Sequence, residues 1–198
     1  MYARFGKRAL DVAGAAALLA LLAPVLLLLA VAVRVGLGAP VLFRQVRAGR
    51  GGVPFAVLKF RTLRDGPGED AARMTRLGAV LRALALDELP QLVNVLRGEM
   101  SLVGPRPLPV GYVALYSPRQ ALRLRPRPGL AGLAQAAGRN AVGWDSRLEL
   151  DARYAEAPLC LSADLALLLR CAALALSARG AAATGHATMP AFRGSKRS

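Results

Sequence analysis

The longest apolar stretch of the chain lies near its N-terminus. Residues 12–33 form a run of 22 uncharged positions, about the length of helix that crosses a hydrocarbon core of roughly 30 Å. Pro24 lies in the middle of this run, where it removes one helical hydrogen bond and favours a kink. The pattern therefore predicts a membrane-inserted helix over residues 1–38 that is broken at Pro24.

Positive charge flanks the apolar run on both sides. The basic residues near its two ends are Arg4, Lys7, Arg8, Arg34, Arg44, Arg47 and Arg50. Because cytoplasmic flanks of membrane helices carry an excess of Lys and Arg, both ends are expected on the cytoplasmic side, and we expect a re-entrant helix. A kinked single span is the alternative, since prolines also occur in spanning helices. A signal peptide fits less well, because the run exceeds the usual signal core of roughly 7–15 residues.

The next segment, residues 40–63, alternates apolar and polar positions around a glycine-rich centre. This pattern predicts a small β-hairpin. On its second strand, the period of two places Lys59 and Arg61 on one face and Leu58 and Phe60 on the other. One face is therefore expected to pack, and the other to present cations.

The rest of the chain has mainly helical patterning. Helical spacing runs with breaks over residues 71–96, and Gly98 offers a stop. Residues 157–176 form a second apolar helix whose only charges are Asp164 and Arg170. These charges favour a buried or surface-lying helix over a second membrane span.

Together, these elements predict an α+β, mainly helical fold. It consists of the proline-broken re-entrant membrane helix, the small β-hairpin and amphipathic surface helices. We expect residues 39–176 to form one domain at the cytoplasmic face of the membrane. The Ala-rich, basic residues 177–198 are predicted to form a disordered tail.

Composition narrows the classes of partner. The chain has 27 Lys and Arg against 12 Asp and Glu, a net charge of +15, which favours anionic membrane lipids, nucleotide phosphates or nucleic acid. Aromatic residues make up only 5% and no nucleic-acid module is recognisable, so nucleic acid is not expected as a partner. Cys160 and Cys171 lie about 16 Å apart if one helix holds both, which is beyond disulfide reach. The lone His186 and these two cysteines do not suggest a zinc site.

Two adjacent acids, Asp87 and Glu88, stand in the otherwise apolar sequence "LDELPQL". They could simply begin a helix, with Asp87 as N-cap, Glu88 complementing the helix dipole and Pro90 in the first turn. Their surroundings instead favour a catalytic role for the two acids. Arg106 lies between two prolines in a stiff turn, and this cation and the basic strand face both suit phosphate oxygens.

Four segments together resemble a known family. They are "PVLFRQVRAGRGGVPFAVLKFRTL", "LDELPQLVNVLRGEMSLVGPRPLPV", "RPRPGLAGLAQAAGRN" and "LDARYAEAPLCLSADLALLLR". Their order and spacing are typical of the bacterial sugar transferases, and residues 4–176 resemble a small monotopic phosphoglycosyl transferase. The resemblance implies transfer of a sugar 1-phosphate from a UDP-sugar to polyprenyl (undecaprenyl) phosphate at the cytoplasmic membrane face. UMP is released, and the step initiates glycoconjugate or exopolysaccharide synthesis.

The resemblance also assigns roles to residues. It implies that Asp87 is the nucleophile that forms a covalent aspartyl-phosphosugar intermediate, and carboxylates are known to do this chemistry. Mg²⁺ held partly by Asp87 would offset the repulsion between the carboxylate and a diphosphate. Glu88 would support the ion or act as a base. The candidates for phosphate and nucleotide contacts are Lys59, Arg61, Arg106, Gln135 and Arg139. Arg44, Arg47 and Arg50 fit a basic collar against anionic lipid head groups at least as well as they fit substrate binding.

Several positions depart from the family pattern. They are Thr62, Leu63, Ala85, Ala131, Leu133 and Ala137. These changes leave open which sugar, nucleotide and glycan pathway the protein serves, and its oligomeric state is open as well. The alternative functions are a non-catalytic, membrane-docked basic scaffold and a degenerate family member that binds donor without forming an adduct.

Overall fold

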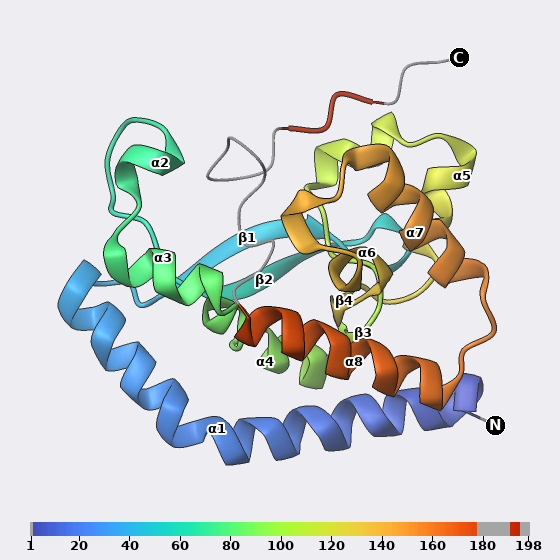
Figure 1. The fold of residues 1–198 in the computed structure, drawn as a ribbon, viewed down its shortest axis with the longest axis horizontal. Coiled ribbons are helices and arrows are strands. Elements are labelled where there is room, and N and C mark those ends of the chain that lie inside the picture. The colour runs from blue at the N-terminus through green and yellow to red at the C-terminus, as the bar shows by residue number, and fades with distance from the viewer. Residues whose placement is uncertain (1, 178–190, 195–198) are drawn as a thin grey trace.

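The computed structural model describes residues 2–177 and 191–194. It has the mainly helical α+β architecture that the sequence predicts, with two small two-stranded sheets (Figure 1). A π-helical turn, Tyr2–Gly6, leads into the longest described helix, α1 (Lys7–Leu37). This helix runs along the base of the molecule and bends partway (Figure 1). Pro24 lies inside it and accounts for a bend, because it removes a hydrogen bond from the helical ladder.

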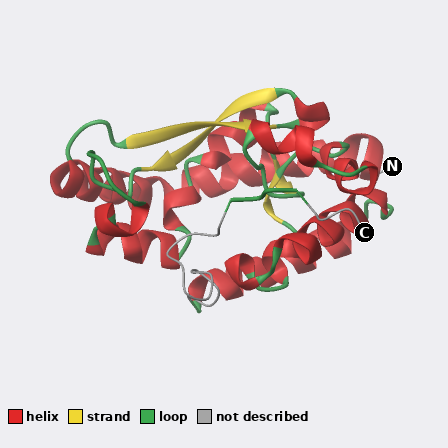
Figure 2. Cartoon of the chain, turned by 90° about the horizontal axis from the view of Figure 1, so that it is seen from above, coloured by secondary structure: helices red, strands yellow, loops and turns green. Residues whose placement is uncertain are grey.

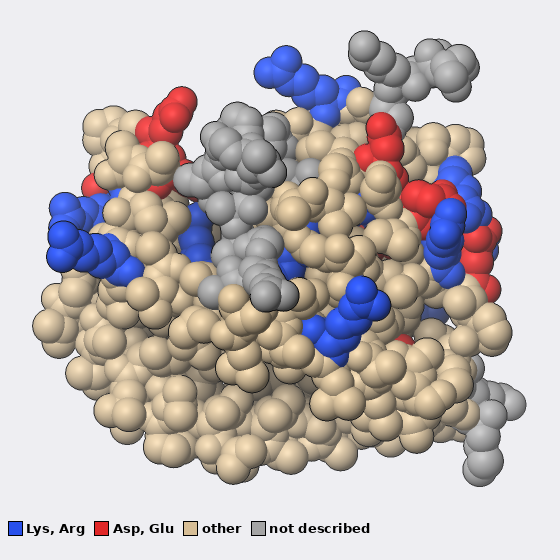
Figure 3. Space-filling view, viewed as in Figure 1, with Lys and Arg blue, Asp and Glu red and all other residues tan. Residues whose placement is uncertain are grey.

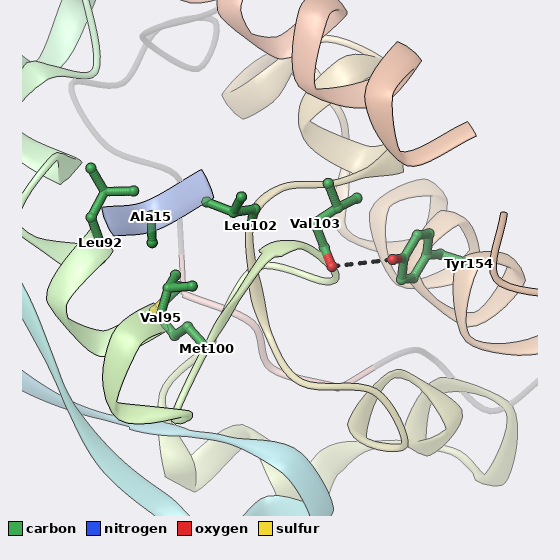
Figure 4. Close-up of a cluster of buried hydrophobic side chains, with 7 residues drawn as sticks. All are labelled: Ala15, Leu92, Val95, Met100, Leu102, Val103 and Tyr154. Carbon is green, nitrogen blue, oxygen red and sulfur yellow. Dashed lines mark hydrogen bonds between the residues drawn. The ribbon is translucent and has the colours of Figure 1, made fainter. Parts of the chain in front are cut away.

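Both arms of α1 pack against the same domain. In the N-terminal arm, Ala15 is fully buried in a hydrophobic cluster with Leu92, Val95, Met100, Leu102, Val103 and Tyr154 (Figure 4). In the C-terminal arm, Val33 is fully buried against Phe60 and Leu81. α1 therefore contributes to the core on both sides of its bend. Among the described helices, it alone is long and apolar enough to cross a membrane.

Buried carboxylates attach the start of α1 to the domain. Asp11, 2% exposed, accepts hydrogen bonds from Ser101 Oγ and the Leu102 N–H, both at 2.9 Å. Asp164, 1% exposed, accepts from Tyr2 Oη at 2.6 Å and from Lys7 Nζ at 2.8 Å. These bonds satisfy carboxylates that would otherwise be costly to bury, and they fix the start of α1 to residues 101–102 and to Asp164.

The predicted hairpin is present. Strands β1 (Leu42–Ala48) and β2 (Pro54–Phe60) pair antiparallel with Leu42 opposite Phe60, around a short 3₁₀ turn at Arg50–Gly52. This hairpin lies along one side of the molecule (Figure 2). Phe60 packs into the core, as predicted, and Lys59 and Arg61 line a cavity that Phe60 borders as well.

The remaining elements are short, apart from the last two helices. The helices after the hairpin are α2 (Asp70–Arg73), α3 (Arg76–Ala83), α4 (Gln91–Arg97), α5 (Pro118–Ala121), α6 (Leu133–Ala136), α7 (Trp144–Glu156) and α8 (Leu161–Leu176). The 3₁₀ turns after the hairpin are Leu86–Glu88, Val110–Leu115, Leu122–Leu124 and Arg139–Ala141. Strands β3 (Ser101–Val103) and β4 (Gly129–Ala131) pair in parallel. Gly98 ends α4 in the left-handed conformation, with φ of 82°, as predicted.

The base of the molecule is apolar. Many of the large hydrophobic side chains that are more than half exposed lie on α1 and α8: Leu21, Leu27, Leu28, Val31, Val35, Leu169 and Leu176. Charged side chains lie over the upper and middle parts of the face in Figure 3, and the lower edge, along α1, shows none. α8 lies at the surface, with Asp164 its one buried residue.

Most of the predicted tail, residues 177–198, lies outside the described residues. Besides Ser177, the described residues of this segment are 191–194, and among them Phe192 is only 4% exposed. It packs against Leu108 and Leu148.

The buried pairing of Asp164 predicts a large stability effect. Asp164→Asn removes the partner of Lys7 in a site that is nearly closed to water, so the free energy of unfolding should fall by about 3 kcal/mol. Glu156→Gln is the matched control, because its ion pair with Arg119 is exposed and should contribute little to stability. Thermal unfolding in detergent compares the two, and equal losses would refute the anchoring role of Asp164.

Candidate active site

One cavity of about 630 Å³ collects the residues that the sequence singled out. Its lining includes all seven predicted catalytic and substrate-binding residues: Lys59, Arg61, Asp87, Glu88, Arg106, Gln135 and Arg139. The volume is within the usual range for small-molecule sites. Pro24 is not part of the lining and belongs to α1.

The two acids lie on a strained turn. Ala85 adopts a left-handed conformation, with φ of 56°, which is uncommon for a residue other than glycine and occurs preferentially at functional sites. The 3₁₀ turn Leu86–Glu88 follows directly. The N-cap of α4 is Pro90, so the interpretation of Asp87 as a helix cap is wrong. The turn instead directs both carboxylates into the cavity.

Glu88 is held by two cations. Lys59 Nζ donates to its Oε1 at 2.7 Å, and Arg106 Nη1 donates to its Oε2 at 2.8 Å while Arg106 Nη2 bonds to Oε1. Burial by itself would raise the pKa of Glu88, but Arg106 and Lys59 hold that pKa well below its usual range. Glu88 is therefore a fixed anion at neutral pH, and its charge keeps Lys59 and Arg106 in the cavity.

Asp87 differs from its neighbour. Its side chain is 6% exposed, and no hydrogen bond joins its carboxylate to the residues that the structure describes. Burial and the charge of Glu88 raise the pKa of Asp87 to about 6, against the attraction of Lys59 and Arg106. The result is a carboxylate that ionises near neutral pH and has lone pairs available for a ligand.

Arg106 is positioned by a tight crossing at the end of β3. Gly104 donates to the carbonyl of Ala131 at 2.8 Å, and a Cβ at Gly104 would lie 2.3 Å from the backbone oxygen of Arg127. The carbonyl of Arg106 accepts from Arg123 Nη2 at 2.6 Å. Arg123 is itself fixed by Asp151 Oδ2 at 2.9 Å, in a pair that is almost fully buried.

Two predicted phosphate ligands are engaged with the backbone. Arg61 donates to the carbonyls of Leu37 and Ala39 and to Asp65, and so ties the end of α1 to the hairpin. Arg139 donates to the carbonyls of Ala83 and Arg82 at 2.9 and 3.1 Å, which caps α3. Their guanidinium groups therefore also have structural roles. Arg61 Nε is buried without a partner, and Gln135 Oε1 is as well.

Sequence reasoning missed several cavity residues. They include Arg82, Tyr112, Trp144 and Arg147. Of the basic collar, Arg47 lines the cavity, but Arg44 and Arg50 do not. A possible signal was the chain's single tryptophan, five residues after Arg139. Tyr112 stood out in no pattern, because it is brought to the cavity only by the folding of distant segments.

The departures from the family pattern fall into two groups. Ala85, Thr62 and Leu63 line the cavity, and Thr62 Oγ1 accepts from Arg82 Nε at 2.9 Å. Ala131, Leu133 and Ala137 do not line it. Only the first group is placed to alter substrate contacts directly.

The donor set of the cavity is compatible with magnesium, although no cluster of three metal-ligating side chains occurs among residues 2–177 and 191–194. Mg²⁺ prefers oxygen ligands, and it is often held by one or two carboxylates together with substrate phosphates. Asp87 offers such a carboxylate, whereas Glu88 is already paired with cations.

Comparison with known proteins identifies the family. The family model described as "Bacterial sugar transferase" matches residues 2–178. The chain is 42% identical over 195 residues to the sugar transferase EpsL of Bacillus subtilis, covering 96% of each protein. It is 53% identical over 145 residues to a UDP-glucose:undecaprenyl-phosphate glucose-1-phosphate transferase of Caulobacter vibrioides, covering 67% of this chain and 54% of that protein. It is 39% identical to the exopolysaccharide production protein ExoY of Rhizobium meliloti, covering 83% of this chain and 82% of that one. The family expected from the four sequence motifs is thereby confirmed, and the chain belongs to the bacterial sugar transferases, which are phosphoglycosyl transferase enzymes.

Proposed function

We propose that this enzyme transfers a sugar 1-phosphate from a UDP-sugar to undecaprenyl phosphate and releases UMP. The names of relatives support the substrates, since that of Caulobacter vibrioides is called a UDP-glucose:undecaprenyl-phosphate glucose-1-phosphate transferase. The name of ExoY supports a role in exopolysaccharide production. The cavity supports the chemistry, because its basic lining suits a diphosphate.

The nucleophile in this proposal is Asp87, and the observation that carries it is the contrast with Glu88. Glu88 accepts hydrogen bonds from Lys59 and Arg106, whereas the carboxylate of Asp87 has no such partner among the described residues. A nucleophile needs lone pairs that are not already committed. Of the two acids, Asp87 therefore suits attack on phosphorus.

The reaction proceeds in two displacements. An Asp87 carboxylate oxygen attacks the phosphorus that carries the sugar, and the bond from that phosphorus to the oxygen of UMP breaks. The product is an aspartyl-phosphosugar with UMP as leaving group. A phosphate oxygen of undecaprenyl phosphate then attacks the same phosphorus, which restores the carboxylate and forms a lipid-linked diphosphosugar.

The cations next to the acids support this displacement. Lys59 and Arg106 are fixed by Glu88, so their charges are already in place when the diphosphate arrives. With its pKa depressed, Glu88 is a weak base, and these contacts favour a positioning role for it. Mg²⁺ bound at Asp87 would supply further neutralisation of phosphate charge. Gln135, Arg61 and Arg139 complete the binding wall.

We also propose that α1 enters the cytoplasmic leaflet and returns to the same face. Both of its arms pack on one domain, which supports a re-entrant helix over a straight span. The apolar base formed by α1 and α8 would lie in the membrane. Basic flanks then contact anionic lipids, and the cavity opens on the cytoplasmic face. Residues 39–176 form the transferase domain in this arrangement.

Loss of the nucleophile predicts loss of the adduct. Wild-type protein incubated with a panel of UDP-sugars should gain the mass of a phosphosugar, and Asp87→Asn should not. UMP release by the variant, with undecaprenyl phosphate and Mg²⁺ present, should fall by at least about a thousandfold. Intact mass and UMP assays measure both effects. Asp145→Asn is the control, because Asp145 is an exposed acid outside the cavity lining. Turnover retained by Asp87→Asn would exclude Asp87 as the nucleophile.

The raised pKa of Asp87 predicts a pH-dependent stability gain in the same variant. Because the folded state binds this proton more tightly than the unfolded chain, the wild-type protein loses stability as pH rises from 3.8 through about 6. Asp87→Asn removes the buried charge and should be more stable by up to about 3 kcal/mol at high pH. Thermal unfolding between about pH 4 and 8 should show the gain fading on acidification. A gain that is the same at all pH values would contradict burial of the charge.

The topology of α1 is testable by labelling. In a Cys160→Ser, Cys171→Ser background, one cysteine is added before Met1 and another is introduced as Arg44→Cys. A membrane-impermeant maleimide should label both in inverted vesicles and neither in intact spheroplasts, because both flanks lie on the cytoplasmic side. Labelling of the two sites from opposite sides would establish a spanning helix.

A further inference from the structure

One end of the cavity has an aromatic wall. Tyr112 and Trp144 both line it, with ring centroids 5.7 Å apart and planes at 89°. The chain has few aromatic residues, yet four of them meet at this end, because Tyr116 and Phe192 pack behind the wall. Aromatic rings exposed in a ligand cavity offer surfaces on which a flat ring can stack.

An incompletely paired arginine lies beside this wall. Arg147 is 5% exposed and lines the cavity, and its guanidinium carbon lies 5.2 Å from the centroid of the Trp144 ring. Its Nη2 donates to the carbonyl of Arg139 at 2.7 Å, but its Nε is buried with no partner. A buried donor without a partner is unfavourable unless a ligand or water supplies an acceptor. The side chain therefore suits an acceptor on a bound ligand.

We propose that Tyr112, Trp144 and Arg147 form the subsite for the nucleobase of the donor, and that Phe192 holds this wall in position. The inference rests on the proposed function, because it assumes a nucleoside diphosphate sugar in the cavity. A pyrimidine stacks on the aromatic faces, and its carbonyl oxygens accept hydrogen bonds from the guanidinium group.

The charges of the cavity connect this end with the acids. Burial, and after it the nearby charge of Arg106, lowers the pKa of both Arg147 and Arg47 to about 10. Both remain cations at neutral pH. Arg147, which packs on Trp144, and Arg106, which pairs with Glu88 beside Asp87, line the same cavity. These cations can contact the diphosphate of a donor while its base stacks on the aromatic wall.

Phe192 acts through its neighbours, because it does not itself line the cavity. Its ring lies 5.6 Å from the ring of Tyr112 and 5.4 Å from that of Trp144. Its backbone N–H donates to Tyr112 Oη at 3.0 Å. It is therefore a positioning residue, supplied by a segment far along the chain from the acids.

A binding titration tests the subsite without requiring turnover. Trp144 is the chain's only tryptophan, so intrinsic fluorescence reports directly on the wall. UMP should change the emission of full-length wild-type protein and of Asp87→Asn, whereas pyrophosphate and ribose 5-phosphate should change it little. If pyrophosphate or ribose 5-phosphate matches UMP, or if UMP has no effect, the subsite is refuted.

Variants separate stacking from folding. Tyr112→Ala should weaken UMP binding about tenfold, the loss expected for one stacked base. Tyr112→Phe keeps the ring but loses the bond from the Phe192 N–H, so it should weaken UMP binding less than Tyr112→Ala does. Phe192→Ala should weaken UMP binding and raise the KM for the donor with little change in kcat. Phe192→Tyr keeps the ring and should give a UMP affinity and a donor KM close to those of the wild type. Arg193→Ala, at an exposed neighbour, is the control. An unchanged UMP affinity in Phe192→Ala would refute the positioning role.

The two proposals can fail separately. If no donor releases UMP but UMP still quenches Trp144, the transferase proposal fails and the base subsite stands. If turnover is robust but Tyr112→Ala and Phe192→Ala leave UMP affinity and the donor KM unchanged, the transferase proposal stands and the subsite fails.

Discussion

Two neighbouring carboxylates share one buried cavity, and the repulsion between them has to be offset for the protein to fold. Lys59 and Arg106 offset this repulsion by forming ion pairs with Glu88. The charge of Asp87 is then only partly compensated. The two acids thus have opposite pKa shifts although they are adjacent in sequence. In such a pair, different environments give different chemical roles. Reactivity at Asp87 therefore depends on the ion pairs of Glu88.

Those ion pairs require three separate segments to meet accurately. Lys59 comes from β2, the acids from a 3₁₀ turn and Arg106 from the chain after β3. Buried contacts outside the cavity fix the last of these, since Arg123 bridges Asp151 and the carbonyl of Arg106. Arg123 donates to Tyr116 Oη as well, so the same contacts reach the ring that packs behind the aromatic wall. The electrostatics of the site thus rest on packing some distance from it.

Local patterns in the sequence predicted much of this arrangement. The apolar run, the hairpin and the stop at Gly98 are local features, and each is present in the structure. The site residues were found through motifs, and the cavity brings them together. The engagement of Arg61 and Arg139 with backbone carbonyls was not predictable, because those partners are distant in sequence. The aromatic wall was missed for the same reason, and a low aromatic content argued against it.

The packing of α1 has a practical consequence for producing the protein. A common way to make a membrane-bound enzyme water-soluble is to delete its apolar N-terminal helix and to express the remaining residues. Here that deletion would take away Ala15 and Val33, leaving the faces of Leu92 and Phe60 uncovered. The remainder would also lose Asp11, which accepts the Leu102 amide. Helix α1 is thus a structural part of the domain that holds the cavity. Preparations that keep this helix, in detergent or in lipid discs, are therefore the ones suited to assays.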